Sequence, residues 1–141
     1  MSMAITLRAK DVMDKRVVLV DRSEPVSSAL RRMLDSGIWS VVVTDEGRPT
    51  AVLTERDFVR MCLIRGCEGA LSVPAGDIAT SPLVTCGPDD PVGYVWKLMV
   101  ERSVRRVYVV DDGAIVGRVT QTGLFQKLLE TFIALSQLVS P

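Results

Sequence analysis

Histidine is absent from this chain of 141 residues, and cysteine and aromatic residues are scarce. Without histidine there is no imidazole for acid–base catalysis, and the cysteines alone make a poor zinc site. Cys62, Cys67 and Cys86 form an odd set that does not suggest a disulfide framework, so we interpret them as small buried apolar residues. A phosphate loop, a dinucleotide fingerprint and a paired-carboxylate motif are also missing. These absences predict a protein that is not an enzyme, with no metal ligands and no covalently bound cofactor.

The chain also lacks an excess of either charge and any long apolar run. Its 17 basic and 17 acidic residues cancel, and no basic stripe with interleaved aromatics is present, so nucleic acid is not an expected partner. No run approaches the ~18 apolar residues of a membrane span. The N-terminal stretch 1–10 lacks the apolar core of a signal peptide. We therefore expect a cytoplasmic protein without a membrane partner.

An internal duplication is the strongest positive feature. At an offset of 66 residues, as from Val26 to Val92, the chain matches itself without a gap. Identities are few, but they fall at turns, helix starts and apolar positions. The helical apolar face predicted in each copy recurs at this offset. Its residues are Val26, Ala29, Leu30, Met33 and Leu34 in the first copy, and Val92, Val95, Trp96, Met99 and Val100 in the second.

Each copy is predicted to run strand, helix, strand, strand, helix. The first strands are 16–20 and 82–86, and Ser23 and Asp89 are the expected N-caps of the helices that follow. An Asp-acid-Gly turn then joins two strands, 41–43 with 50–53 and 107–110 with 114–119. The last helices begin at Thr54 and Thr120; the first ends at Gly66 and the second extends towards Val139.

These elements divide the chain into four segments. We place the first domain at residues 8–68, a Gly- and Pro-punctuated linker at 69–74, the second domain at 75–135 and a C-terminal tail at 136–141. One copy alone buries little apolar surface. We therefore expect the two copies to share a core, packed sheet to sheet.

The repeated motifs resemble the CBS domain family, specifically a tandem pair, or Bateman module. The resemblance covers about Lys10 to Leu129 and rests on "SGIWSVVVTDEG" (36–47), "RSVRRVYVVDDG" (102–113) and above all "AVLTERDFVR" (51–60). It implies an α/β (α+β) fold class of two pseudo-symmetric β-α-β-β-α units packed through their sheets. It also implies a regulatory module that binds an adenosyl ligand, such as AMP, ADP, ATP or S-adenosylmethionine, in the cleft between the repeats.

The resemblance places the ligand at the start of the second helix. Asp57 would accept hydrogen bonds from the two ribose hydroxyls, Thr54 would contact ribose or phosphate, and Arg56 could reach a phosphate. An alternative needs no ligand: Thr-x-x-Asp at a helix start is also a capping box. The two roles are compatible, since an N-cap can also contact a ligand.

Further candidate contacts come from both copies. Val18 and Ile38 would lie against the base, and Trp39 would either stack on it or fill the cleft floor. Arg105 would reach phosphate or contact a second subunit, and Thr120 repeats Thr54. Gly123 stands where the second copy should carry the ribose-binding acid. We therefore predict one competent site and one weakened or lost site.

A ligand-free structural or dimerisation module is the competing hypothesis. The stretch 125–139 carries more apolar residues than one small unit needs, and the zero net charge removes repulsion between copies. We expect a homodimer. If the module senses a ligand, a partner protein, unidentified by sequence, would respond to a change in packing.

Overall fold

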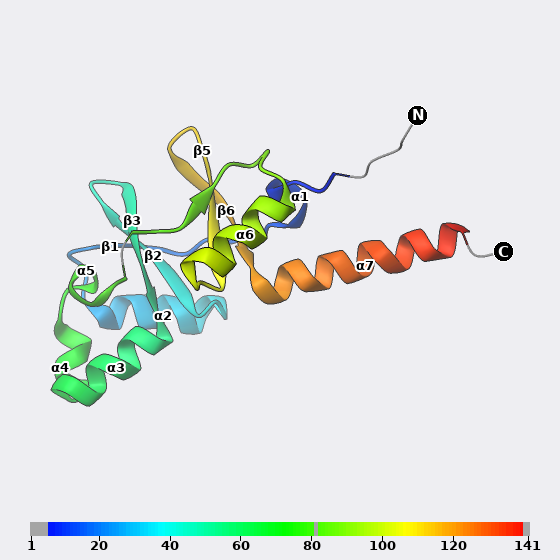
Figure 1. The fold of residues 1–141 in the computed structure, drawn as a ribbon. Helices are drawn as coiled ribbons and strands as arrows, with labels where there is room; N and C mark the ends of the chain where they lie inside the picture. The colour runs from blue at the N-terminus through cyan, green and yellow to red at the C-terminus, as the bar shows by residue number, and fades with distance from the viewer. Residues whose placement is uncertain (1–5, 81, 140–141) are drawn as a thin grey trace. The chain divides into compact units, whose positions relative to one another are not determined.

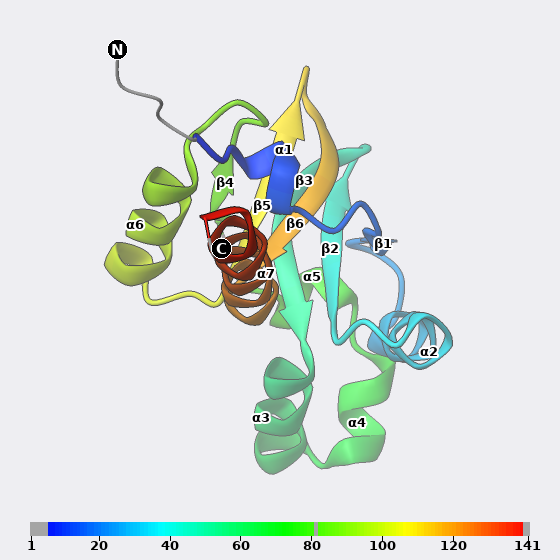
Figure 2. The ribbon, with the colours of Figure 1, turned by 90° about the vertical axis from the view of Figure 1, so that its right-hand side faces the viewer.

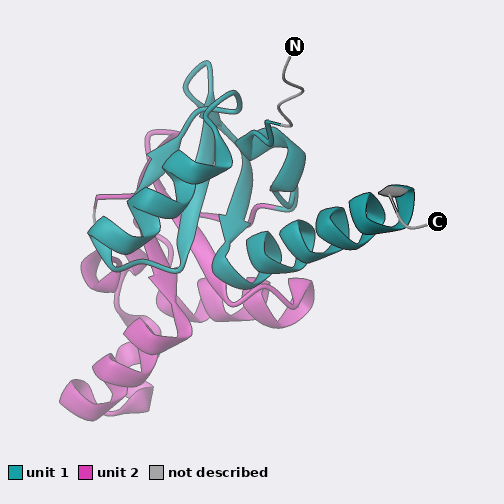
Figure 3. Cartoon of the chain, turned by 45° about the vertical axis from the view of Figure 1, so that its right-hand side comes forward, with its two compact units in different colours: residues 1–16, 84–141 teal, residues 17–83 magenta. Residues whose placement is uncertain are grey.

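The computed structural model describes residues 6–80 and 82–139 and divides into two compact units (Figure 3). Unit 2 comprises residues 17–83, and unit 1 comprises residues 1–16 together with 84–141. Each unit contains one three-stranded sheet with a parallel pair followed by an antiparallel pair. The mixed α+β architecture and the two repeats confirm the predicted fold class.

Unit 2 contains the sheet β1-β2-β3 and four helices, labelled in Figure 1. In chain order they are β1 (Leu19–Asp21), α2 (Val26–Ser36), β2 (Ser40–Asp45), β3 (Arg48–Thr54), α3 (Glu55–Arg65), α4 (Cys67–Ser72) and α5 (Ala75–Ile78). The β2–β3 hairpin turns at Glu46 and Gly47, both with positive φ, as the Asp-acid-Gly motif predicts. Gly66, with φ of 80°, ends α3 as expected.

Unit 1 repeats this plan with the sheet β4-β5-β6. Its elements are α1 (Ala9–Val12), β4 (Thr85–Cys86), α6 (Val92–Arg102), β5 (Arg106–Asp111), β6 (Ala114–Thr120) and α7 (Gln121–Val139). Helices α2 and α6, and the hairpins β2–β3 and β5–β6, agree residue for residue at the predicted offset. Helix α7 is longer than its counterpart α3 and extends beyond its sheet (Figure 1).

The short helices α1 and α5 belong to the unit of the other copy. Backbone hydrogen bonds join Asp14, after α1, to Arg118 of β6 in unit 1. The same pair of bonds joins Thr80, after α5, to Val52 of β3 in unit 2. The chain therefore passes between units at 16/17 and 83/84, whereas the sequence copies begin near residues 8 and 75. Residues 69–72 of the expected linker lie in α4, and residues 136–139 of the expected tail lie in α7.

The predicted N-caps of α2 and α6 were wrong. Pro25 and Pro91 occupy the N-cap positions, and the helices begin one residue later. Ser23 is instead engaged in a turn, where its amide and hydroxyl both donate to the carboxylate of Asp21. Asp89 accepts a hydrogen bond from Lys10. Ser23 and Asp89 are therefore hydrogen-bonded to other groups instead of capping a helix.

The predicted helix faces were partly wrong as well. Met33 and Met99 are buried, but the residues that follow them, Leu34 and Val100, are 73% and 61% exposed. Successive residues of a helix point about 100° apart, so a helix resting on one sheet buries a narrower stripe than we predicted. Trp96 is also half exposed for this reason. The interpretation of the cysteines as buried residues holds for Cys86 alone, since Cys62 is partly exposed and Cys67 is exposed.

Candidate functional site

One end of the unit 2 sheet brings together the candidate residues of the first copy. Strand β3 ends at Thr54, which pairs with Ser40 at the start of β2. Ile38 and Trp39 immediately precede β2 and so lie at the same end. The carbonyl of Val18, just before β1, accepts a hydrogen bond from the Val42 amide of β2. Sheet topology therefore gathers these predicted residues near the N-terminus of α3.

Asp57 lies in the first turn of α3 and is only 6% exposed. Its Oδ2 accepts hydrogen bonds from the Thr54 amide, at 2.8 Å, and from the Thr54 hydroxyl, at 3.1 Å. The Asp57 amide lies 3.4 Å from the Thr54 hydroxyl in return. Thr54 and Asp57 thus form the capping box that sequence spacing allowed. The geometry shows the structural role of the pair directly.

Two neighbours of Asp57 were missed by sequence reasoning. The Thr80 hydroxyl, from the segment after α5, donates to Asp57 Oδ1 at 3.2 Å. Arg60, one turn further along α3, places a guanidinium nitrogen 4.0 Å from the same oxygen. No motif marks Thr80, because its contact depends on α5 packing into unit 2. The contact with Arg60 could have been predicted from its i, i+3 spacing with Asp57 on the same helix.

The other candidates of unit 2 differ in exposure. Ile38 is buried, and its amide bonds to the Ser36 hydroxyl beyond Gly37, which has positive φ. Trp39 is half exposed, so its indole is available for stacking as well as packing. Arg56 is exposed in the first turn of α3. Unit 2 therefore carries one buried carboxylate, one half-exposed aromatic residue and one exposed cation among its candidates.

Unit 1 holds the remaining candidates in an equivalent but weaker arrangement. Arg105 precedes β5, and its carbonyl accepts a hydrogen bond from the Gln121 amide at the start of α7. The Thr120 hydroxyl accepts from the Gly123 amide at 3.0 Å, so this copy keeps half of the capping box. Gly123 supplies no carboxylate. A Cβ atom at this position would lie 2.8 Å from the Thr120 hydroxyl, which must therefore shift to admit a side chain.

Asp14 supplies a carboxylate to unit 1, although in the sequence it belongs to the first copy. Asp14 accepts hydrogen bonds from Arg16 and from Arg118, each with a contact of about 3 Å. Hydrogen bonds from Arg16, aided by the charge of Arg118, lower the pKa of Asp14 to about 2. At the matching position in unit 2 stands Thr80, the neighbour of Asp57. Unit 1 therefore carries an acid at the position where unit 2 carries Thr80.

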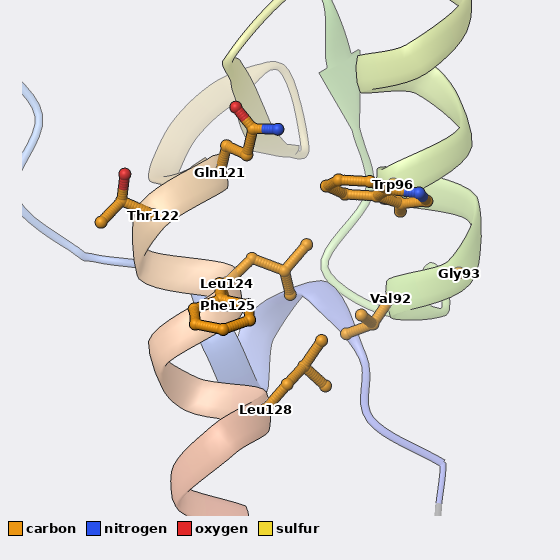
Figure 4. Close-up of a pocket in the computed structure, with 8 residues that line it drawn as sticks. All are labelled: Val92, Gly93, Trp96, Gln121, Thr122, Leu124, Phe125 and Leu128. Carbon is orange, nitrogen blue, oxygen red and sulfur yellow. The ribbon is translucent and has the colours of Figure 1, made fainter.

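An apolar pocket of about 640 Å³ lies between α6 and the start of α7 in unit 1 (Figure 4). Trp96 and Val92 line it from α6, and Phe125 and Leu128 line it from α7. A second pocket of about 470 Å³ shares Val92 and Leu128 and continues along α7. The lining offers few polar groups, so these pockets suit apolar side chains better than a phosphate-bearing ligand.

Residues 6–80 and 82–139 show neither a candidate metal site nor a helix that could span a membrane. Within these ranges no three acidic, cysteine or histidine side chains gather in a way that could hold a metal ion. No helix described there is both long enough and apolar enough to cross a membrane.

The fold is that of a duplicated α+β module. The sequence profile of the CBS domain matches residues 9–63 and 75–130, so the chain belongs to the CBS domain family, as a tandem pair. CBS domains are typically regulatory and not catalytic. An uncharacterized protein of Methanopyrus kandleri is 33% identical over 118 residues, which cover 82% of this chain and 60% of that protein. The chain spans 44% of the length of a second relative, an uncharacterized protein from Methanocaldococcus jannaschii.

Solved structures share the fold. An uncharacterized conserved protein from Pyrococcus horikoshii superposes with a TM-score of 0.76 and 28% identity, covering 89% of this chain and 94% of that one. The CBS domain pair of protein MJ0100, solved with 5′-methylthioadenosine and S-adenosyl-L-methionine, has a TM-score of 0.77 at 21% identity, covering 90% and 99% of the two chains. At that identity the similarity establishes the fold, and the ligands belong to that protein.

Proposed function

We propose that this CBS pair is a regulatory module that binds an adenosyl ligand at the Thr54–Asp57 end of unit 2. The observation that carries the proposal is the buried carboxylate of Asp57, held at a sheet end where the residues before β1 and β2 also converge. Buried acids are uncommon unless they are paired or functional. The adenosyl ligands bound by the CBS pair of MJ0100 support the ligand class.

The remaining hydrogen-bonding capacity of Asp57 limits how a ribose can bind. A carboxylate offers about four lone-pair positions. Two on Oδ2 are taken by Thr54, and one on Oδ1 is taken by Thr80. A ribose hydroxyl can use the fourth position directly. The second hydroxyl requires the Thr80 or Thr54 hydroxyl to rotate away, which makes Thr80 a competitor of the ligand.

The two repeats should differ in their affinity for the ligand. In unit 1, Gly123 leaves the Thr120 hydroxyl without an acid beside it. Binding should therefore depend mainly on unit 2, with Val18, Ile38 and Trp39 against the base. Arg56 in unit 2, and Arg105 in the weaker site of unit 1, are proposed to favour phosphate through their planar guanidinium groups. Occupancy would change packing, and a partner protein would detect the change.

Calorimetric and thermal-shift titration with AMP, ADP, ATP, NAD and S-adenosylmethionine tests this function. A ligand at 100 times its Kd stabilises the protein by roughly 2.7 kcal/mol, so the melting temperature should rise clearly. Asp57→Asn should abolish the rise. Asp11→Asn is the matched control, because Asp11 also accepts a backbone amide three residues earlier, at 2.8 Å, but lies in unit 1 outside the candidate site. An equal rise in melting temperature in both variants would show that Asp57 is not part of the binding site.

A second candidate function, dimerisation, is favoured by a specific feature of α7. Its apolar residues Phe125, Leu128, Phe132 and Leu135 alternate at spacings of three and four, the pattern of a coiled-coil seam. Phe125 and Phe132 are 67% and 69% exposed. We refer to these four residues as the α7 seam. It is continuous with the apolar pockets beside Trp96 and Leu128.

The exposed area of this apolar surface is similar to the area that each partner buries in a dimer interface. The α7 seam, with Trp96, Leu129 and Ile133, exposes roughly 800 Å² when typical side-chain areas are scaled by exposure. A standard interface buries about that area on each partner. A second copy presents the same seam, and a two-fold axis makes one patch complementary to itself. We therefore propose a homodimer in which two α7 helices pack together.

A further inference from the structure

The junction of α3 and α4 places two cysteines beside each other. Cys62 lies in the last turn of α3, and Cys67 is the first residue of α4. Gly66 separates the helices and adopts φ 80° and ψ 150°, which reverses the chain. The Gly66 amide donates the last hydrogen bond of α3, to the Cys62 carbonyl at 2.8 Å, and the Gly66 carbonyl accepts the first hydrogen bond of α4, from the Ala70 amide at 3.0 Å.

The two helices pack against each other beyond this turn, as Figure 2 shows for α3 and α4. Cys67 is exposed and Cys62 is partly exposed, so both thiols can meet a reagent from solvent. Desolvation and the neighbouring Cys67 thiol raise the pKa of Cys62 to about 11. Cys62 and Cys67 flank the single turn at Gly66, where α3 and α4 pack together. Cys86, in contrast, is buried in the core of unit 1.

We infer that Cys62 and Cys67 form a reversible disulfide and are a redox modification site of this protein. A low-molecular-weight disulfide such as oxidised glutathione is the oxidant. The exposed Cys67 thiolate attacks one sulfur of this oxidant, forms a mixed disulfide and releases one glutathione thiolate. Cys62, as a thiolate, then attacks the Cys67 sulfur and releases the second glutathione.

The reaction balances without any further reagent. Two protein thiols are oxidised to one disulfide, one glutathione disulfide is reduced to two thiols, and the two cysteine protons end on glutathione. The order of attack follows from exposure, since the more accessible sulfur meets the reagent first. Because Cys62 must lose its proton in the second step, closure should accelerate as pH rises. This inference does not depend on the proposed adenosyl function.

Intact-mass spectrometry of the full chain incubated with oxidised glutathione tests the site. Wild type should lose the mass of two hydrogen atoms, keep one alkylatable thiol after unfolding, and regain all three with dithiothreitol. Cys62→Ser should instead accumulate a stable glutathione adduct on Cys67. Cys86→Ser is the control and should form the internal disulfide at the wild-type rate.

The closed disulfide should also raise the melting temperature, because it restricts the unfolded chain. Cys67→Ser should show neither the mass change nor this rise. A glutathione adduct that persists on wild-type Cys67 would overturn the inference. So would disulfides formed only between chains, visible as covalent dimers on non-reducing gels.

Discussion

At the scale of single residues, two carboxylates illustrate how position decides role. Asp57 and Asp14 are both satisfied by several hydrogen bonds, but Asp57 caps a helix while Asp14 pairs with two arginines. The sequence marked Asp57 through its motif. It gave no sign of Asp14, because Arg118 is distant along the chain and meets Asp14 only when α1 packs into unit 1.

The lowered pKa of Asp14 predicts a pH-dependent contribution to stability. Its pKa is about 2 in the folded protein, against an ordinary value of 3.8. Stabilisation is therefore full above pH 3.8 and is lost as pH falls through 3.8 towards about 2. Because Asp14 is about one-third exposed, solvent screening reduces the contribution to about 1 kcal/mol.

Urea unfolding of Asp14→Asn measures this contribution. The variant should be about 1 kcal/mol less stable than wild type near neutral pH, and the difference should shrink as the pH approaches 2. Asp89→Asn is the comparison, since its bridge to Lys10 is highly exposed and should matter little at any pH. A difference that stays constant in acid would show that charge pairing at Asp14 is not the cause.

At the scale of elements, helix α7 departs most from the symmetry of the repeat. Its counterpart α3 ends at Gly66, whereas α7 continues to Val139 with its apolar seam uncovered within the part of the chain that the structure describes. Exposed apolar faces of this size mark interaction sites. The helical length was predictable from sequence, because no Gly or Pro interrupts residues 124–139.

Phe132→Glu tests the α7 seam directly. A charge at the centre of a packed helix pair is costly to bury, so the homodimer should dissociate to monomer in analytical ultracentrifugation. Gln137→Glu adds the same charge on the polar face of the same helix and should leave the dimer intact. Finding wild type monomeric at high concentration, or Phe132→Glu still dimeric, would contradict dimerisation through this seam.

At the scale of the whole molecule, the duplication is structurally faithful but chemically uneven. Helices α2 and α6 and the two hairpins match residue for residue, while the acid of the capping box occurs in only one copy. This difference suggests a testable stoichiometry for an adenosyl ligand, namely one binding event per chain.

Gly123→Asp tests that asymmetry. If the remaining contacts of the second copy are adequate, calorimetry should show a second binding event once the acid is restored. The Thr120 hydroxyl must move to admit the new side chain, so the affinity of this site should be lower than that of the first. Gly93→Asp adds the same charge at a position where an added Cβ meets nothing within 4 Å, and should leave the stoichiometry at one. Unchanged stoichiometry in Gly123→Asp would indicate that the second pocket lacks more than the acid.

The sequence by itself determined the repeat, the order of its elements and the capping box, because each depends on local spacing and turn chemistry. Only the tertiary structure decided that α1 and α5 pack into the unit of the other copy, which brings Thr80 to Asp57 and Asp14 to Arg118. It also decided which apolar helix residues stay exposed, and that Cys62 and Cys67 flank one turn. These features depend on contacts between segments far apart in the chain or on the direction of a turn, and spacing alone encodes neither.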